Sequence, residues 1–360
     1  MRFGSLLAAL ALLQAGCQSF PASCSLPQTD FARLSLAPAS LKMDAAPSTL
    51  PAPEHHCWDG CKSDKGPKTL LAWSEHKKKC KNGNGDNQDD EEADDEDEEE
   101  DDTIVTDRPD FTEATTTVGR GRIQLEAGYT YFHDDEDGTL SQFHSYPEML
   151  WRIGMFADWF ELRLGWNFGH ERERTGGIGT GRSGSEDLYL GCKLALTEQQ
   201  GICPEMALIL QMTVPTGSNN FSADEVHPGF NLLYGWDVIP DLISMAGSTQ
   251  MNRTRPGEGV LQFPFEVEAG PDDGNRHSFL EVAQSFTIGY TLTAVLGAYT
   301  EWFALFPHSS TDPEVGPEYY FNGGFTYLVT NNFQLDIRAG VGLNKHADDL
   351  FAGSGFSVRY

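Results

Sequence analysis

Charged side chains recur at alternate positions from residue 126 to the end of the chain. Several have a neighbour of opposite charge two residues away, as in Glu161 with Arg163 and Asp336 with Arg338. Residues two apart point to the same side of a β-strand, so these charges would face a shared interior. An open, wet interior would give them a transverse field that orients polar solutes and sets ion selectivity, whereas a sealed one would make them a structural ion-pair network. The candidate lumen-lining residues are Glu126, Glu148, Arg152, Glu161, Arg163, Lys193, Glu281, Glu301, Asp336, Arg338 and Arg359.

Motifs for covalent catalysis are absent from the sequence. It contains no GxSxG nucleophile motif and no phosphate-binding loop. One enzyme alternative is a barrel phospholipase, to which His308, Ser309, Ser310 and Asp312 would contribute. Surface loops that contain Ser and His are far commoner than such sites, so we expect no enzyme activity and no catalytic residue.

Metal binding has equally little support. His55, His56 and Cys57 lie near Cys61 and Cys80, but this spacing lacks the second half of a zinc motif. The acidic run of residues 86–102 lacks the glycine and the spacing of a calcium-binding loop. We therefore expect no metal and no cofactor.

Strict alternation of apolar and polar residues supplies the elements that would position the charges. Phe160, Leu162 and Leu164, for example, alternate with Glu161 and Arg163. This is the period of a strand with one apolar and one polar face. Twelve such segments are expected, at residues 122–132, 144–155, 159–170, 185–197, 204–215, 227–239, 241–252, 277–290, 292–305, 317–330, 332–343 and 352–360.

The connections between these segments alternate between long polar loops, such as residues 133–143 and 171–184, and tight turns. Sorting of long and short connections to opposite ends is typical of an outer-membrane barrel, and segments of ten or more residues match the about 9 to 11 needed to cross a bilayer. A mean hydropathy of −0.40 excludes a helical membrane protein. The sequence predicts an all-β, transmembrane, antiparallel up-and-down β-barrel of about 12 strands, with a disordered N-terminal leader.

The N-terminal third divides by composition. An apolar run ending in Ala15-Gly16-Cys17 predicts an export signal, with either lipidation of Cys17 or ordinary cleavage nearby. The expected organisation is an export signal at 1–17, a disordered leader containing Pro, Lys and Cys at 18–85, an acidic linker at 86–102, an N-terminal segment or plug at 103–121, and the barrel at 122–360.

Two stretches carry a family resemblance. Thr106 to Glu113, reading TDRPDFTE, and Gly121 to Tyr129, reading GRIQLEAGY, resemble the beginning of the outer-membrane transporter family labelled "MetA-pathway of phenol degradation". Later matches are at residues 204–207, 213–217, 342–344, 348–349 and 355–357. The resemblance covers roughly residues 104–360 and implies a bacterial outer-membrane barrel that takes up aromatic or other hydrophobic small molecules. It transfers no catalytic residue.

These observations lead to one functional expectation and two alternatives. We expect an outer-membrane channel or transporter for small, aromatic or hydrophobic solutes, located in a double-membraned bacterium with a periplasmic N-terminal arm. The expected partners are outer-membrane lipid, the solute, and the barrel assembly machinery, which would recognise the terminal aromatic Tyr360. A net charge of −29 makes nucleic acid an unsuitable partner. The alternatives are a structural, adhesion or receptor barrel that anchors the acidic arm, and the phospholipase.

Overall fold

The computed structural model describes residues 103–136, 138–254, 278–308 and 316–360. The predicted export signal with Cys17, the leader and the acidic linker lie outside the described residues, as do Ser309, Ser310 and Asp312. No helix in the described part of the chain has the length and apolar content required to cross a membrane.

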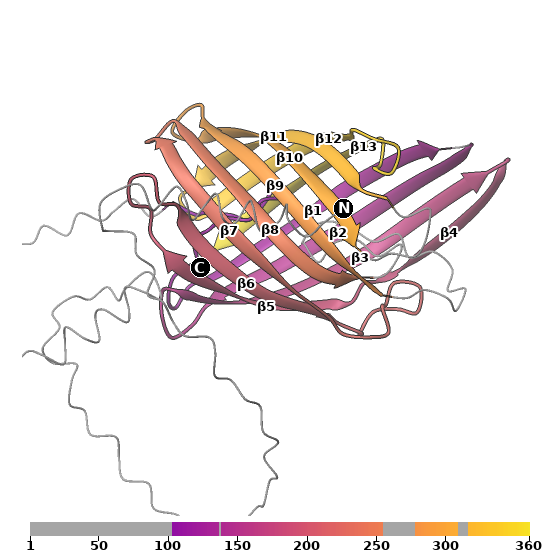
Figure 1. Cartoon of the computed structure of the whole chain (residues 1–360), viewed down its shortest axis with the longest axis horizontal. Helices are drawn as coiled ribbons and strands as arrows, with labels where there is room; N and C mark the ends of the chain where they lie inside the picture. The colour runs from indigo at the N-terminus through magenta and orange to yellow at the C-terminus, as the bar shows by residue number, and fades with distance from the viewer. Residues whose placement is uncertain (1–102, 137, 255–277, 309–315) are drawn as a thin grey trace, which may run out of the picture. The chain divides into compact units, whose positions relative to one another are not determined.

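The described strands form one closed antiparallel barrel (Figure 1). Consecutive strands pair along the sheet, and β1 closes it by pairing with both β2 and β13. The strands β4 and β5 occupy one position in the wall, because both pair with β3 in succession. The predicted barrel of twelve strands is therefore confirmed. Its strands are β1 (Ile123–Glu136), β2 (Thr139–Gly154), β3 (Phe160–Thr175), β4 (Ile178–Ser185), β5 (Leu188–Thr197), β6 (Glu205–Val214), β7 (His227–Ile239), β8 (Ile243–Thr254), β9 (Phe279–Thr291), β10 (Leu296–His308), β11 (Glu318–Thr330), β12 (Phe333–Gly342) and β13 (Leu350–Arg359).

The two faces of each strand differ in chemistry, as strand β12 illustrates. Its inward positions include the buried Asp336 and Arg338, while Leu335, Ile337 and Val341 point outward. Ile337 is 56% exposed on the outer surface. An apolar exterior around a polar interior is the inverse of a soluble barrel and suits insertion into lipid.

Two predicted loops are wrong. Residues 133–143 and 171–184 form the ends of paired strands in the β1–β2 and β3–β4 hairpins, which extend beyond the rest of the wall (Figure 1). Gly176 and Gly177 make the two-residue turn of the β3–β4 hairpin. Both have positive φ, as a type I′ turn requires. The alternation fades there because strands outside the lipid need no apolar face, although their backbones still pair.

A β-bulge in β2 reverses which residues face inward. The β2–β3 register shifts between Tyr146 and Met149, so Ser145 is inward before the bulge and Leu150 after it. Glu148 lies in the bulge with φ of 45°, a left-handed conformation that is unusual for a residue other than glycine. The bulge directs this carboxylate into the barrel.

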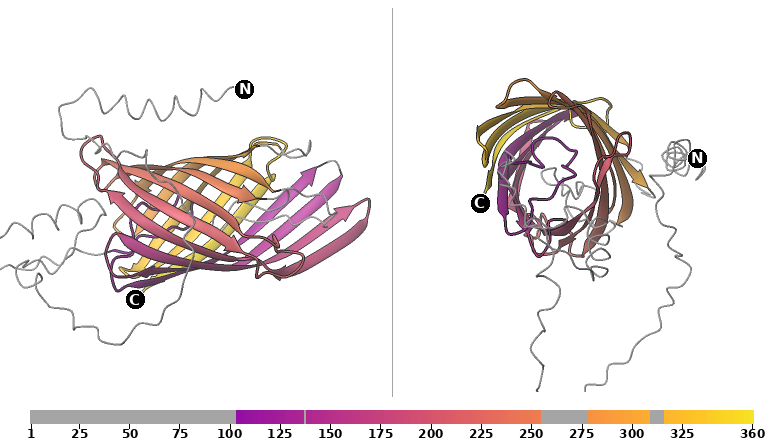
Figure 2. Two further views of the ribbon diagram at one scale, coloured as in Figure 1. Left: turned by 60° about the horizontal axis from the view of Figure 1, so that its bottom comes forward. Right: turned by 90° about the vertical axis from the view of Figure 1, so that its left-hand side faces the viewer.

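Residues 103–121 lie inside the barrel and are called the luminal segment below (Figure 2, right). The Ile104 N–H donates to the Asn331 carbonyl over 2.7 Å, and the Gly121 N–H donates to the Gly154 carbonyl over 2.9 Å. Asn331 and Gly154 adjoin the tight turns, so the segment enters and leaves at that end. Gly154 permits this approach, because a Cβ there would lie 1.6 Å from the Gly119 carbonyl oxygen.

A charge placed on the outer face tests the membrane-facing assignment. We expect Ile337→Arg to lower the free energy of unfolding by about 2 to 4 kcal/mol, since an arginine near the bilayer centre is costly. Ile178→Arg is the matched control, because Ile178 lies 76% exposed beside the β3–β4 turn, where we expect almost no change. Denaturant titration in phospholipid vesicles measures both variants, and equal effects would contradict the assignment.

Candidate functional site

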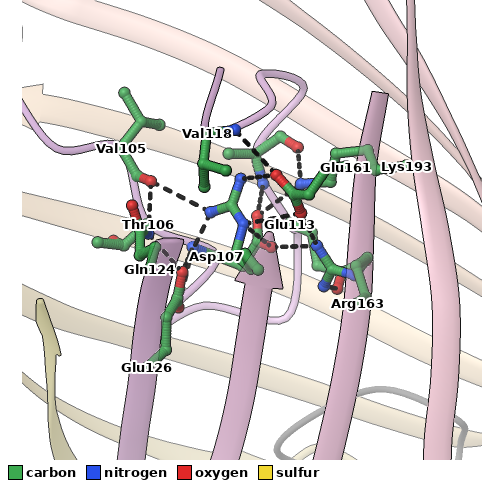
Figure 3. A network of polar contacts seen from close by, with 12 residues as sticks. Val105, Thr106, Asp107, Glu113, Val118, Gln124, Glu126, Glu161, Arg163 and Lys193 are labelled. Atoms are coloured by element: carbon green, nitrogen blue, oxygen red, sulfur yellow. Dashed lines mark hydrogen bonds and ion pairs between the residues drawn. The ribbon is translucent and has the colours of Figure 1, made fainter. Parts of the chain in front are cut away.

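Asp107 is the centre of the contacts between the luminal segment and the wall (Figure 3). The Lys193 ammonium donates to its Oδ1 over 2.8 Å, and Arg163 and Arg152 reach its Oδ2, Arg152 at 3.3 Å. All four side chains are almost completely buried. One carboxylate of the segment thus contacts three cations, which are contributed by β2, β3 and β5.

Glu126 of β1 binds the backbone at the same place. It accepts hydrogen bonds from the N–H groups of Asp107 and Arg108 at 3.0 to 3.1 Å, and it also pairs with Arg152 over 3.1 Å. Arg152 in turn donates to the Val105 and Thr116 carbonyl oxygens at 3.1 and 3.0 Å. Charged wall residues therefore satisfy backbone groups that would otherwise be buried without partners.

Three further ion pairs extend this network along β3. Glu161 accepts from Arg152 at 2.9 Å and from the Val118 N–H at 2.9 Å. Arg163 pairs with Glu161 and with Glu113 of the luminal segment. The part of the segment around Asp107 and the part from Glu113 to Val118 are thus held by the same group of wall residues.

Arg108 lies on the β1–β13 side of the lumen. Its guanidinium pairs with Glu148 over 2.8 Å and with Asp336 over 3.2 Å. The glycine pair Gly128 and Gly355, which are opposite each other in the β1–β13 ladder, makes room for it. A Cβ on either glycine would lie 2.4 to 2.5 Å from Arg108 atoms, so side chains there would displace the guanidinium.

Glu301 of β10 holds the innermost turn of the segment. Its carboxylate accepts from the N–H groups of Phe111 and Thr112, each over 2.7 Å, and from the Asn322 side chain over 2.8 Å. The Phe111 ring stacks on Phe303 with centroids 4.4 Å apart. This stack is the point at which the segment joins the apolar part of the lumen.

Beyond that stack, towards the long connections, the lumen is aromatic. Phe303, Tyr320 and Phe351 lie with ring centroids 4.7 to 6.3 Å apart, and Phe132 is 5.7 Å from Phe351. Such tilted and stacked pairs suit π-systems. The aromatic cluster comprises Phe111, Phe132, Phe143, Phe221, Phe303, Tyr320 and Phe351, with Ala283, Leu305 and Ala347 between them.

Burial and charge set the protonation of the segment's acids. Burial alone would raise the pKa of the Asp107 carboxyl, but Arg152, Lys193 and Arg163 outweigh it and hold that pKa well below its usual range. Burial and the nearby Glu301 carboxylate raise the pKa of Asp110. Burial also raises the pKa of Glu113, against the opposing effect of Arg163. Asp107 is therefore the ionised anchor, and Asp110 favours its neutral form.

The structure brings most of the sequence-predicted residues together around the luminal segment. Glu281 is apart from them: it is buried between β8 and β10, and its Oε1 has no hydrogen-bond partner within the described ranges. Arg359 lies at the rim, where it donates to the Asn332 side chain over 2.8 and 2.9 Å. Tyr360 is 76% exposed and exchanges backbone hydrogen bonds with Ile123. Those in contact with the luminal segment are Glu126, Glu148, Arg152, Glu161, Arg163, Lys193, Glu301, Asp336 and Arg338.

Sequence reasoning missed the partners of these residues within the segment. Asp107, Arg108 and Glu113 lie in a stretch without periodicity, so nothing placed their side chains. A usable signal was their charge, because a short segment that carries both signs before a charged barrel offers counter-ions. Gly128 and Gly355 were also missed, since a glycine on a polar face gives no indication of what fills its space.

Removal of the Asp107 carboxylate tests the network. We expect Asp107→Ala to lower the free energy of unfolding by about 3 to 5 kcal/mol, because it removes the one carboxylate that contacts all three buried cations. Asp135→Ala, which removes an exposed carboxylate from the β1–β2 hairpin, is the control and should change it by less than about 0.5 kcal/mol. Denaturant unfolding of both variants in vesicles gives the comparison; equal stability would refute a structural role for Asp107.

Comparison with known proteins gives a family and a fold. Among solved structures, an outer membrane channel from Pseudomonas putida F1 is similar with a TM-score of 0.53 and 11% identity, over 71% of this chain and 100% of that one. The NanC porin gives 0.39 at 8% identity, over 66% and 98%. The translocator domain of the autotransporter NalP from Neisseria meningitidis gives 0.42 at 11% identity, over 66% and 88%.

These likenesses concern the fold. No curated protein sequence matches the chain. A family profile described as "Putative MetA-pathway of phenol degradation" matches residues 106–360, which include the luminal segment from Thr106 onward and all the strands. The match spans more than half of the chain, and the chain therefore belongs to this family.

Proposed function

We propose that the protein is an outer-membrane channel for small aromatic or hydrophobic solutes, and that the luminal segment closes it when docked. One observation carries the proposal: the segment fills the polar part of the lumen through ion pairs and hydrogen bonds, and it contributes Phe111 to the aromatic cluster. The similar Pseudomonas putida protein is itself described as an outer membrane channel.

The orientation follows from the connections. Outer-membrane barrels have short periplasmic turns and longer outer loops. The extended β1–β2 and β3–β4 hairpins (Figure 2, left) would then face the exterior. The luminal segment would enter from the periplasm. The acidic arm that precedes residue 103 would start on the periplasmic side.

The chemistry of the lumen changes along the proposed path. A solute that enters from outside first meets Phe132, Phe143 and Phe351, whose rings offer apolar and π contacts. Further in, Phe111 and Glu301 separate this region from the ion-pair network. These rings are only 1 to 6% exposed, so an aromatic or aliphatic solute would bind by separating them, and the docked segment would block its exit.

The kind of bonding makes release of the segment chemically reasonable. When the segment leaves and water enters the lumen, charged groups and amides can replace their protein hydrogen bonds with hydrogen bonds to water. An apolar plug would instead expose its apolar surface to water with no such replacement. The two interpretations of the charged lumen-lining residues, a structural ion-pair network and an ion-selective passage, then belong to two states. With the segment docked, Arg152, Arg163 and Lys193 are structural; with it released, they line a charged passage.

A reversible cross-link tests closure. The Oγ atoms of Thr112 and Ser285 lie 2.6 Å apart, so Thr112→Cys/Ser285→Cys places two thiols within disulfide reach. We expect the oxidised protein to show neither single-channel conductance nor uptake of a phenolic solute into liposomes, and a reductant to restore both. Thr112→Cys alone is the control; transport by the oxidised double variant at the control's rate would refute closure by this segment.

The titration of Asp110 gives a pH dependence. Docking raises the pKa of this carboxyl, so the docked state binds more protons than the released state. Docking is therefore strongest at acid pH and weakens as the pH rises through the raised pKa. We expect mean conductance to increase as the pH rises above the usual titration range of an aspartate and Asp110→Asn to flatten that increase. Planar bilayer recordings measure it, and an identical pH profile in the variant would exclude Asp110 as the titrating group.

A further inference from the structure

The outward face of the β1–β3 sheet carries a basic patch near the long-connection end. Its members are adjacent by strand register: Tyr131 pairs with His144, and His144 with His170. One step further out, His133 pairs with Gln142, and Gln142 with Arg172. The outer basic patch is defined as His133, His144, His170, Arg172 and Arg174.

Hydrogen bonds order the inner part of this surface. The Tyr129 hydroxyl is 2.7 Å from His144 Nδ1, and the Gln142 amide donates to the Tyr131 hydroxyl over 2.7 Å. The His144 and His170 rings lie with centroids 5.9 Å apart. The patch is therefore carried by a rigid, three-stranded wall rather than by a loop.

Its two arginines have no protein partner within the described residues. Arg172 and Arg174 are exposed and form neither an ion pair nor a side-chain hydrogen bond there. Two other arginines near this end differ, since Arg182 pairs with Glu171 over 2.6 Å and Arg253 with Glu225 over 3.1 Å. In a chain of net charge −29, unpaired cations on one outer face are a distinct feature.

The position of the patch matches the edge of the lipid. The outward face of β3 is apolar from Phe160 to Phe168 and then continues with His170, Arg172 and Arg174. Eight residues rise about 26 Å along a strand, or about 20 Å along the membrane normal at a tilt of about 40°. Because the apolar band of such barrels is about 25 Å tall, His170 to Arg174 begin at the level of the outer headgroups.

From these observations we propose that the outer basic patch binds the phosphate groups of an outer-leaflet glycolipid of the lipid A type. Guanidinium groups match phosphate oxygens in geometry and charge, and aromatic residues such as Trp166 and Tyr146 would contact the adjoining acyl region. No carboxylate of β1–β3 lies level with Arg172 on this face: Asp135 of β1 is level with Arg174, two strands away, and Glu173 is on the opposite face of β3. The inference rests on the proposed outer-membrane location.

Native mass spectrometry of the full chain in a non-ionic detergent tests the proposal. The probe is bisphosphorylated lipid A, compared with chemically dephosphorylated lipid A and with inorganic phosphate as a competitor. We expect Arg172→Gln/Arg174→Gln to weaken binding of the bisphosphorylated lipid about tenfold and to leave binding of the dephosphorylated lipid unchanged. Arg253→Gln is the matched control, since it removes an outward arginine that is already paired, and it should bind as the unaltered chain does.

Each other outcome overturns the proposal. Equal affinity for phosphorylated and dephosphorylated lipid would show that the phosphates are not recognised, and an unaffected double variant would remove the patch from the interaction. Displacement of the lipid by inorganic phosphate at equal concentration would reassign the surface to free anions. Retention of folded mobility on unheated gels verifies that the variants fold. A chain that fails to fold into vesicles of any composition would instead contradict the outer-membrane location itself.

Discussion

Buried charge must be matched by counter-charge, and Asp107 of the luminal segment shares this role with the wall carboxylates Glu126 and Glu161. Arg152, Arg163 and Lys193 face the lumen from adjacent positions of the wall, where uncompensated cations would cost several kcal/mol each. A barrel of twelve strands is wider than the class whose own side chains fill it. The luminal segment supplies volume and two further carboxylates, those of Asp107 and Glu113. Wall and segment are therefore electrostatically one unit, although they are distinct in the chain.

That constraint divides the lumen into two chemical regions. On the side of the tight turns, ion pairs and amide-to-carboxylate hydrogen bonds dominate, and on the other side the rings of the aromatic cluster do. Phe111 and Glu301 mark the boundary. Phe111 stacks on Phe303, and Glu301 accepts hydrogen bonds from the backbone N–H groups of Phe111 and Thr112. A segment docked through exchangeable polar contacts, next to a packed aromatic cluster, is the physical basis of the proposed gating.

Much of this architecture could be predicted from the period of the sequence, because a barrel wall imposes alternation on every strand. The alternation of side chains along a strand alone placed Glu161, Arg163, Asp336 and Arg338 on the inner face. The β3–β4 hairpin was mistaken for a loop because strands in water lose that period while their backbones still pair. Alternation could not show that Arg359 lies at the rim. It also could not show that Asp107 lies among three wall cations, because the luminal segment is irregular and its position depends on contacts distant in sequence.

Amide hydrogen exchange of the full chain in lipid nanodiscs tests most directly whether the luminal segment docks and releases. The amides of Asp107, Arg108, Phe111 and Thr112 donate to Glu126 and Glu301. The account predicts that these four exchange together, more slowly than exposed turns but faster than paired amides of β1, because they open as one unit. Exchange as slow as that of β1 would mean that the segment never leaves, and exchange at the rate of exposed turns would mean that it is not docked.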